Sequence, residues 1–72
     1  MQNSLNYYSI VADNIKKLRI ENGLSQEKFS EQIDCTREFI NRLENYKEKP
    51  SLQMLLKIAD KYNKHPSYFF ET

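Results

Sequence analysis

The 72-residue chain contains few of the residues that cross-link or interrupt a fold: it has one cysteine, one glycine, two prolines and no tryptophan. A single cysteine excludes an internal disulfide and fits a reducing cytosol, so we expect a cytoplasmic protein. No apolar run approaches the roughly 18 residues that a membrane-spanning helix needs. No basic segment followed by an apolar one marks a signal peptide. We therefore expect no membrane partner.

Residues that bind metals or act as nucleophiles are equally scarce. One histidine, His65, and one cysteine, Cys35, cannot form a zinc site without acidic residues at suitable spacing, and none is found. Cys35 occupies an apolar position and is interpreted as a core residue, not a redox switch. His65 precedes Pro66 and is interpreted as a helix-start residue. We expect no metal, no cofactor and no enzymatic activity, because a domain this small has little room for a catalytic pocket.

Excess charge of one sign is also missing. The formal net charge is +1, which by itself is weak support for a nucleic-acid partner, because nucleic-acid-binding domains are commonly strongly basic. The distribution is uneven: residues 16–19 are basic, residues 21–34 are mainly acidic, and residues 37–49 again contain several arginines and lysines. A near-neutral protein can still carry a basic stripe.

Two short helical patterns lie close together between Leu24 and Asn45, and each has its own start signal. Ser25 is predicted to cap the first helix and Thr36 the second. The apolar positions in this stretch are Phe29, Ile33, Cys35, Ile40 and Leu43. Their spacing does not describe one continuous helix face. It predicts two helices that meet at a sharp angle around a shared apolar centre, which is a helix-turn-helix.

The rest of the chain adds three more helical patterns and no strand pattern, so we expect an all-α domain. Ser9 is predicted to cap the first helix, and Gly23 to end it in a left-handed conformation. Ser51 is predicted to cap the fourth helix, and Pro66 to begin a short fifth one. The expected helices cover residues 9–22, 26–33, 37–45, 52–62 and 66–70.

The N-terminal residues are predicted to be less regular. Residues 1–8 are polar and are interpreted as an N-terminal tail or lead-in, which leaves residues 9–72 as the helix-turn-helix domain. Tyr7 and Tyr8 either belong to a partly ordered terminus or pack on the body or on a partner chain.

Over roughly residues 10–70 the chain resembles the Cro-like or lambda-repressor-like helix-turn-helix family, often called the XRE type. The matching pieces, in the family's order and spacing, are I-K-K-L-R at 15–19, G-L-S-Q-E at 23–27, R-x-x-I-x-R-L-E-N at 37–45, P-S-L at 50–52 and L-L-K-I-A at 55–59. The resemblance implies a five-helix lambda-repressor-like bundle.

Two positions depart from the family's pattern, which usually has glycine at both. One is Asp34, in the turn between the second and third helices, and the other is Tyr46, after the third helix. Aspartate tolerates left-handed backbone better than most residues. A tyrosine with positive φ is unusual, so we expect the loop after the third helix to differ locally from the family.

The resemblance implies that the helix at 37–45 enters the major groove of DNA with its N-terminal residues at the base edges. The base-contact candidates are Arg37, Glu38, Asn41 and Arg42. Arginine pairs with guanine in bidentate fashion, and Glu38 can accept from a cytosine amino group. The phosphate-contact candidates at helix starts and in the next loop are Gln26, Thr36, Asn45, Lys47 and Lys49. Glu48, between the two lysines, is expected to point away from the DNA.

The resemblance also implies two structural features. Arg19 is expected to form an ion pair with Glu44 that fixes the angle of the recognition helix. Phe69 is expected to fill the core. Tyr68 and Phe70, on either side of it, are expected to form the dimer interface, so at least one of them should be exposed in a monomer.

The function implied by the resemblance is a sequence-specific transcription regulator that binds double-stranded DNA. One recognition helix covers only a few base pairs, so we expect a homodimer on a two-fold operator. The aromatic-rich C-terminal end is also similar to the small controller proteins of restriction–modification systems. The alternative is an antitoxin or another protein-binding regulator on the same scaffold, which the near-neutral charge also suits.

Overall fold

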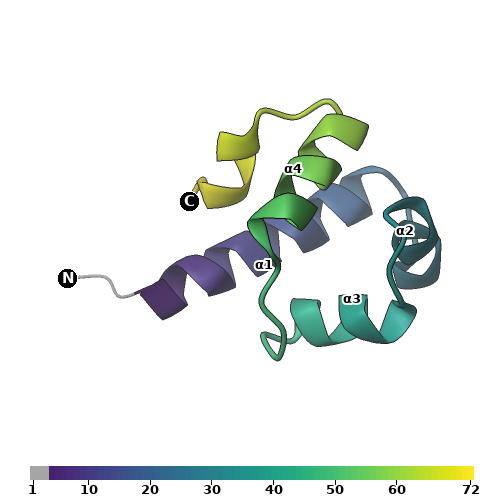
Figure 1. The fold of residues 1–72 in the computed structure, drawn as a ribbon, viewed down its shortest axis with the longest axis horizontal. Coiled ribbons are helices and arrows are strands. Elements are labelled where there is room, and N and C mark those ends of the chain that lie inside the picture. Colours follow the sequence, from purple (N-terminus) through teal and green to yellow (C-terminus); the bar gives the residue numbers. More distant parts are fainter. Residues whose placement is uncertain (1–3) are drawn as a thin grey trace.

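The computed structural model describes residues 4–72, with side chains from Tyr7 onward, and this part of the chain is helical without any strand (Figure 1). The elements are α1 (Ser4–Glu21), α2 (Gln26–Gln32), α3 (Arg37–Glu44), α4 (Leu52–Lys61) and the 3-10 helix η1 (Pro66–Phe70). The all-helical prediction is confirmed. The expected five-helix bundle is corrected to four α-helices and one 3-10 helix.

Serine and threonine side chains begin three of the helices as predicted. The hydroxyl oxygens of Ser25, Thr36 and Ser51 each accept a hydrogen bond, at 3.0 Å, from the backbone amide three residues further on. Each cap satisfies an amide that a helix start leaves without an intrahelical partner. Helices α2, α3 and α4 therefore begin at the predicted residues, and each ends one residue earlier than predicted.

The start of α1 differs from the prediction. The helix begins at Ser4, so Ser9 lies inside it and is not its N-cap. Residues 4–8 of the predicted lead-in belong to α1, and residues 1–3 lie outside the described residues.

The apolar spacing of α1 explains why it extends further back. Val11 and Ile15 are buried on the inner face of the helix, and Tyr8 lies three residues before Val11. Tyr8 therefore continues the same helical face towards the N-terminus. No α-helix in the described residues is long and apolar enough to cross a membrane.

The core is formed by side chains from every helix. The largest fully buried side chains are Phe29, Phe69, Ile15, Leu18, Ile33, Ile40, Leu43 and Ile58. Burial of each such side chain contributes about 1.5–3 kcal/mol, so the core gives the short helices the stability that they lack in isolation.

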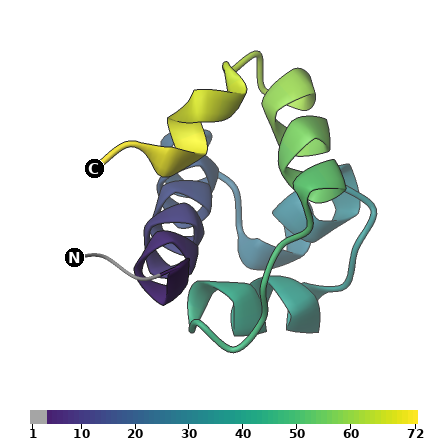
Figure 2. The same ribbon diagram turned by 60° about the vertical axis from the view of Figure 1, so that its left-hand side comes forward.

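The C-terminal segment is attached to α1. The Asn14 side-chain amide donates to the carbonyl oxygens of Phe69 and Glu71, both at 2.9 Å. At the start of η1, Nδ1 of His65 accepts from the Ser67 amide at 3.1 Å, so His65 is the helix-start residue that we predicted. Figure 2 shows η1 lying along α1.

Two turns of the helix-turn-helix region adopt left-handed backbone without glycine. Asp34 has φ 58° and Tyr46 has φ 65°, so both family glycine positions keep the conformation for which glycine is suited. The local difference that we expected at Tyr46 is therefore absent from its backbone. The Tyr46 hydroxyl donates to the Asp13 carboxylate of α1, and this contact favours the unusual conformation.

Gly23 offers a test of how the end of α1 is formed. Its φ is 67°, and an added Cβ would meet no heavy atom within 4 Å. We predict that Gly23→Ala lowers the free energy of unfolding by about 1–2 kcal/mol, because the cost is backbone strain alone. Gly23→Asn should lose clearly less, because asparagine tolerates left-handed backbone. Urea denaturation measures both, and an equal loss for the two variants would contradict this account.

Candidate nucleic-acid interface

The outer face of α3 collects the four predicted base-contact residues. Arg37, Glu38, Asn41 and Arg42 are all exposed and line one shallow hollow on the surface. The opposite face of α3 buries Ile40 and Leu43 in the core. Helix α3 runs along one edge of the molecule in both ribbon views (Figures 1 and 2), so this polar face is accessible along its length.

An ion pair between α1 and α3 sets the orientation of this face. The Arg19 guanidinium donates through Nε to Glu44 Oε2 at 2.7 Å and through Nη2 to Glu44 Oε1 at 3.0 Å. Its Nη1 donates to the Leu24 carbonyl oxygen at 2.7 Å. Glu44 is only 8% exposed. A bidentate, nearly buried pair restricts both partners to one geometry, so α3 is fixed relative to α1.

Gln26 connects this ion pair to the exposed polar face of α3. Its Nε2 donates to Glu44 Oε1 at 3.0 Å, and its Oε1 accepts from Asn41 Nδ2 at 3.3 Å. A carboxylate only accepts hydrogen bonds, so Glu44 determines which end of the Gln26 amide faces it. Gln26 in turn presents its oxygen to Asn41. The side chain that we assigned to phosphate contact is therefore engaged within the protein at both ends of its amide.

The other phosphate-contact candidates lie at the two ends of α3. The Thr36 hydroxyl oxygen caps α3, and its proton remains available to a phosphate. Asn45 donates to the Asn41 carbonyl oxygen at 2.8 Å. Lys47, two residues after Asn45, is exposed. The Lys49 ammonium lies 5.0 Å from the centre of the Tyr8 ring, so this lysine is drawn towards α1.

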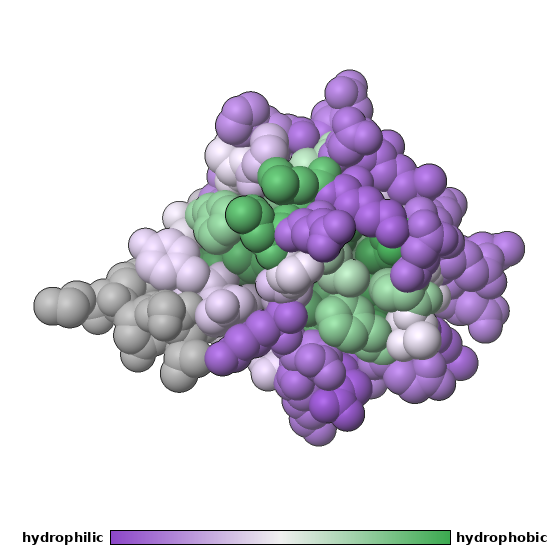
Figure 3. All heavy atoms as spheres, viewed as in Figure 1, coloured by the Kyte–Doolittle hydropathy of each residue, from purple (hydrophilic) through white to green (hydrophobic). Residues whose placement is uncertain are grey.

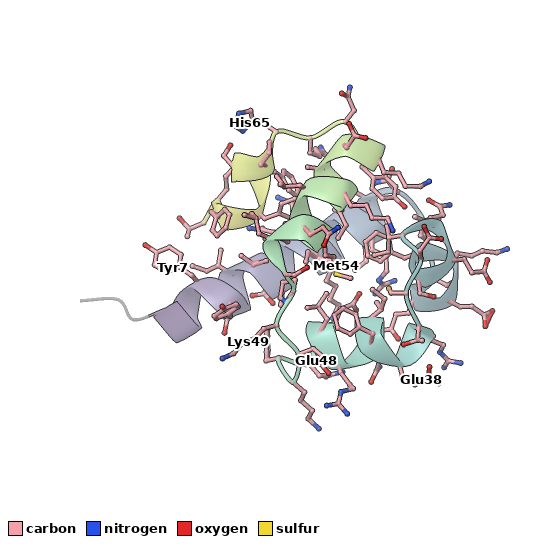
Figure 4. All side chains as sticks on the ribbon, viewed as in Figure 1. Tyr7, Glu38, Glu48, Lys49, Met54 and His65 are labelled. Atoms are coloured by element: carbon pink, nitrogen blue, oxygen red, sulfur yellow. The ribbon has the colours of Figure 1, made fainter. Side chains whose placement is uncertain are left out.

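We expected Glu48 to point away from the DNA. In the structure it instead approaches Arg42 on the exposed polar face of α3. Its Oε2 lies 3.2 Å from Arg42 Nε. Figure 4 shows Glu48 beside the C-terminal half of α3, at the opposite end of that helix from Glu38. The error arose because sequence alternation along a loop says little about side-chain direction.

A second surface feature is an apolar groove of about 320 Å³. Its lining residues come from α1, the α3–α4 loop, α4 and η1; they are Tyr7, Tyr8, Val11, Pro50, Leu52, Leu55 and Phe70. Hydrophobic residues gather on the face shown in Figure 3, over α4 and η1.

Only one of the two residues assigned to the dimer interface lines this groove. Phe70 is 47% exposed there. Tyr68 is instead half-buried: its ring packs on the core under the Lys64 ammonium, and its hydroxyl donates to Glu21 at 3.3 Å. Tyr7 and Tyr8 also line the groove, which agrees with the alternative in which they pack on the body, and the helical spacing of Tyr8 with Val11 is the signal that favours this alternative.

Cys35 is half-buried against the core, as predicted. Burial raises the pKa of its thiol, and Asp34 adds to this rise while Lys57 opposes it. A raised thiol pKa is the reverse of what a reactive cysteine needs. Among residues 4–72, no group of three or more histidine, cysteine or acidic side chains is placed to bind a metal ion.

Comparison with known proteins gives a consistent result. A helix-turn-helix family model, HTH_3, matches residues 15–69. Curated relatives include uncharacterized HTH-type transcriptional regulators of Rickettsia prowazekii and Rickettsia conorii, each 32% identical over 63 residues, or 88% of this chain. The chain spans about half the length of these relatives, 48% and 50% respectively.

Solved structures agree with the fold. An HTH_3 family transcriptional regulator from Vibrio cholerae aligns with a TM-score of 0.82 and 25% identity over 94% of this chain and 38% of that one. A mutant of a restriction–modification controller protein aligns with a TM-score of 0.77 and 28% identity over 97% of this chain and 86% of its own. A hypothetical transcription factor from Neisseria, at 18% identity and a TM-score of 0.82, shares the fold.

The Arg19–Glu44 pair generates a stability prediction. We predict that Glu44→Ala lowers the free energy of unfolding by about 3 kcal/mol, because Arg19 then remains largely buried without its partner. Glu31→Gln is the control, because it breaks an exposed pair with Lys28 and should cost less than about 1 kcal/mol. Urea denaturation of both variants checks this, and similar losses would contradict a structural role for Glu44.

Proposed function

Because the chain belongs to the HTH_3 helix-turn-helix family of transcription regulators, we propose that it recognises a two-fold operator as a homodimer with α3 in the major groove. The observation that carries this proposal is the exposed polar face of α3, oriented by the Arg19–Glu44 pair. A helix with exposed arginine and amide side chains on one side has the donors and acceptors that base edges in the major groove require.

Base readout is assigned to the side chains on this face, which are Arg37, Glu38, Asn41 and Arg42. Arg42 is the leading guanine reader, because a guanidinium makes two parallel hydrogen bonds to O6 and N7 of guanine. Asn41 suits adenine, which pairs with an amide in the same bidentate way. Because Gln26 accepts from the Asn41 amide nitrogen, the orientation of that amide is set before DNA arrives.

Phosphate contact is assigned to Thr36, Asn45, Lys47 and Lys49, and to the backbone at Gln26. These groups flank the two ends of α3, where a duplex lying along the helix presents its backbone. Lys49 has to leave the Tyr8 ring to reach a phosphate. Phosphate contacts fix the register of α3 without reading sequence.

The homodimer is supported by the apolar groove. Phe70, Tyr7 and Tyr8 are between 40% and 47% exposed, and each aromatic side chain therefore leaves roughly 100 Å² of largely apolar surface uncovered. Together with Leu52 they form a patch large enough to be the centre of an interface that buries about 800 Å² on each partner. We therefore extend the proposed dimer interface from Phe70 to the whole groove. Tyr68 packs against the core instead and holds η1 in place.

The position of the groove suits a two-fold operator. It is lined by Pro50, from the loop that connects α3 to α4, and by Leu52 at the start of α4. We propose that a two-fold axis passes through the groove and that the two copies of α3 then occupy half-sites about 34 Å apart.

Two substitutions separate base readout from phosphate contact. Arg42→Ala should relax the preference for guanine at one operator position and weaken specific binding by about 1–3 kcal/mol. Lys47→Ala should weaken binding to all sequences alike and reduce the slope of log affinity against log salt by about one. Fluorescence anisotropy with a selected and an unrelated duplex measures both. Identical behaviour of the two variants on both duplexes would refute the assignment of Arg42.

A third substitution tests the dimer interface. Phe70→Ser should raise the dimer dissociation constant about tenfold or more, because it removes an exposed aromatic from the proposed contact. Leu56→Ser is the matched control: Leu56 is also exposed, at 46%, but does not line the groove. Sedimentation measures both. An unchanged dimer in the Phe70 variant contradicts this interface, and a wild-type monomer supports the alternative of a different protein partner.

A further inference from the structure

The loop after α3 is attached to its helix and to α1 immediately before Glu48. The Lys47 amide donates to the Arg42 carbonyl oxygen at 2.8 Å, and the Tyr46 amide donates to the Leu43 carbonyl oxygen at 3.1 Å. The Tyr46 hydroxyl reaches the Asp13 carboxylate on α1. The backbone leading into Glu48 is therefore fixed by hydrogen bonds on both sides of the left-handed residue.

The loop packs on α1 again two residues after Glu48. Pro50 is buried and lines the apolar groove beside Tyr8 and Val11. Attachment on both sides leaves little freedom for the Glu48 backbone, so the carboxylate is presented to α3 from a defined position.

The Glu48 carboxylate meets Arg42 at a particular nitrogen. Glu48 Oε2 lies 3.2 Å from Arg42 Nε, and the side chains are 35% and 58% exposed respectively. A guanidinium is a rigid planar fork, so this ion pair favours orientations of the whole group that keep Nε beside the carboxylate. The terminal Nη1 and Nη2 groups remain available to DNA. The O6 and N7 atoms of guanine accept hydrogen bonds from such a pair of N–H donors.

We propose that Glu48 is a positioning residue for sequence readout: it orients the Arg42 guanidinium so that its terminal nitrogens face guanine. This inference rests on the proposed function and adds to it a specificity determinant outside the recognition helix. With α3 in the major groove, Glu48 is flanked in the chain by Lys47 and Lys49, which we assign to phosphate contact, so its carboxylate repels phosphates and weakens binding to every sequence. Glu48 thus lowers the affinity for every sequence and increases the discrimination between bases.

The test uses Glu48→Gln, which removes the charge and keeps the shape. The probes are a duplex that the wild-type protein selects from a random pool, the same duplex with its guanine replaced at the position that Arg42→Ala relaxes, and an unrelated duplex. Fluorescence anisotropy should show that discrimination against the replaced guanine falls about two- to fivefold, the range expected for an exposed ion pair. Binding to the unrelated duplex should become tighter.

Two controls separate positioning from net charge. Asp60→Asn removes the same charge from the last turn of α4, at the far end of that helix from α3 (Figure 1), and should leave discrimination unchanged. In the Arg42→Ala background, Glu48→Gln should no longer alter discrimination, because the residue that it positions is absent. Urea denaturation verifies that each variant remains folded.

Each remaining outcome overturns the inference. If Glu48→Gln tightens all three duplexes equally, the carboxylate acts only by repulsion. If it tightens the selected duplex most, Glu48 competes with DNA for Arg42. An effect that persists without Arg42 excludes positioning through that residue. If the wild-type protein selects no sequence, the proposed function fails and this inference fails with it, whereas the other three outcomes leave the proposed function intact.

Discussion

The Arg19–Glu44 pair is the interaction on which the rest of the structure depends. One guanidinium binds the carboxylate at the end of α3 with two hydrogen bonds and the Leu24 carbonyl oxygen with a third. It therefore joins α1, the start of the helix-turn-helix and the end of α3. Charge-assisted hydrogen bonds are about twice as strong as neutral ones, and low exposure of Glu44 protects them from competing water. The working face of α3 takes its direction from this pair.

The same carboxylate influences the surface through the side chains around it. Glu44 orients the Gln26 amide, and Gln26 orients Asn41. On the other side of the face, Glu48 contacts Arg42 from a loop attached to α1. Asn41 and Arg42 of α3 each contact a partner from another segment, so the arrangement of this exposed polar face depends on the whole fold. Preorganised side chains lose less freedom on binding and bind with better specificity.

Local chemistry explains what could be predicted from sequence. The caps at Ser25, Thr36 and Ser51 depend on contacts within one helical turn, so the starts of three helices were predicted correctly. The start of α1 depends on packing of Tyr8 against distant loop and helix residues, and local polarity was misleading there. The final helix was predicted in place but not in type: the five-residue segment that begins at Pro66 adopts 3-10 geometry, a distinction that apolar spacing does not resolve.

The candidate site also has features that the sequence predicts and features that it does not. Exposure of Arg37, Glu38, Asn41 and Arg42 follows from helical periodicity, because the apolar positions of α3 determine which side remains outside. Helical periodicity does not predict which partners these exposed side chains contact. The Gln26–Asn41 and Glu48–Arg42 contacts join residues on different elements, and only the folded arrangement brings them together.

The central claim is that α3 reads base edges in a two-fold arrangement. The most direct measurement is selection of bound sequences from a random duplex pool, combined with the mass of the isolated complex. The account predicts an inverted repeat with half-sites about one helical turn apart, and a mass of two chains on one duplex. Absence of any enriched sequence would contradict it.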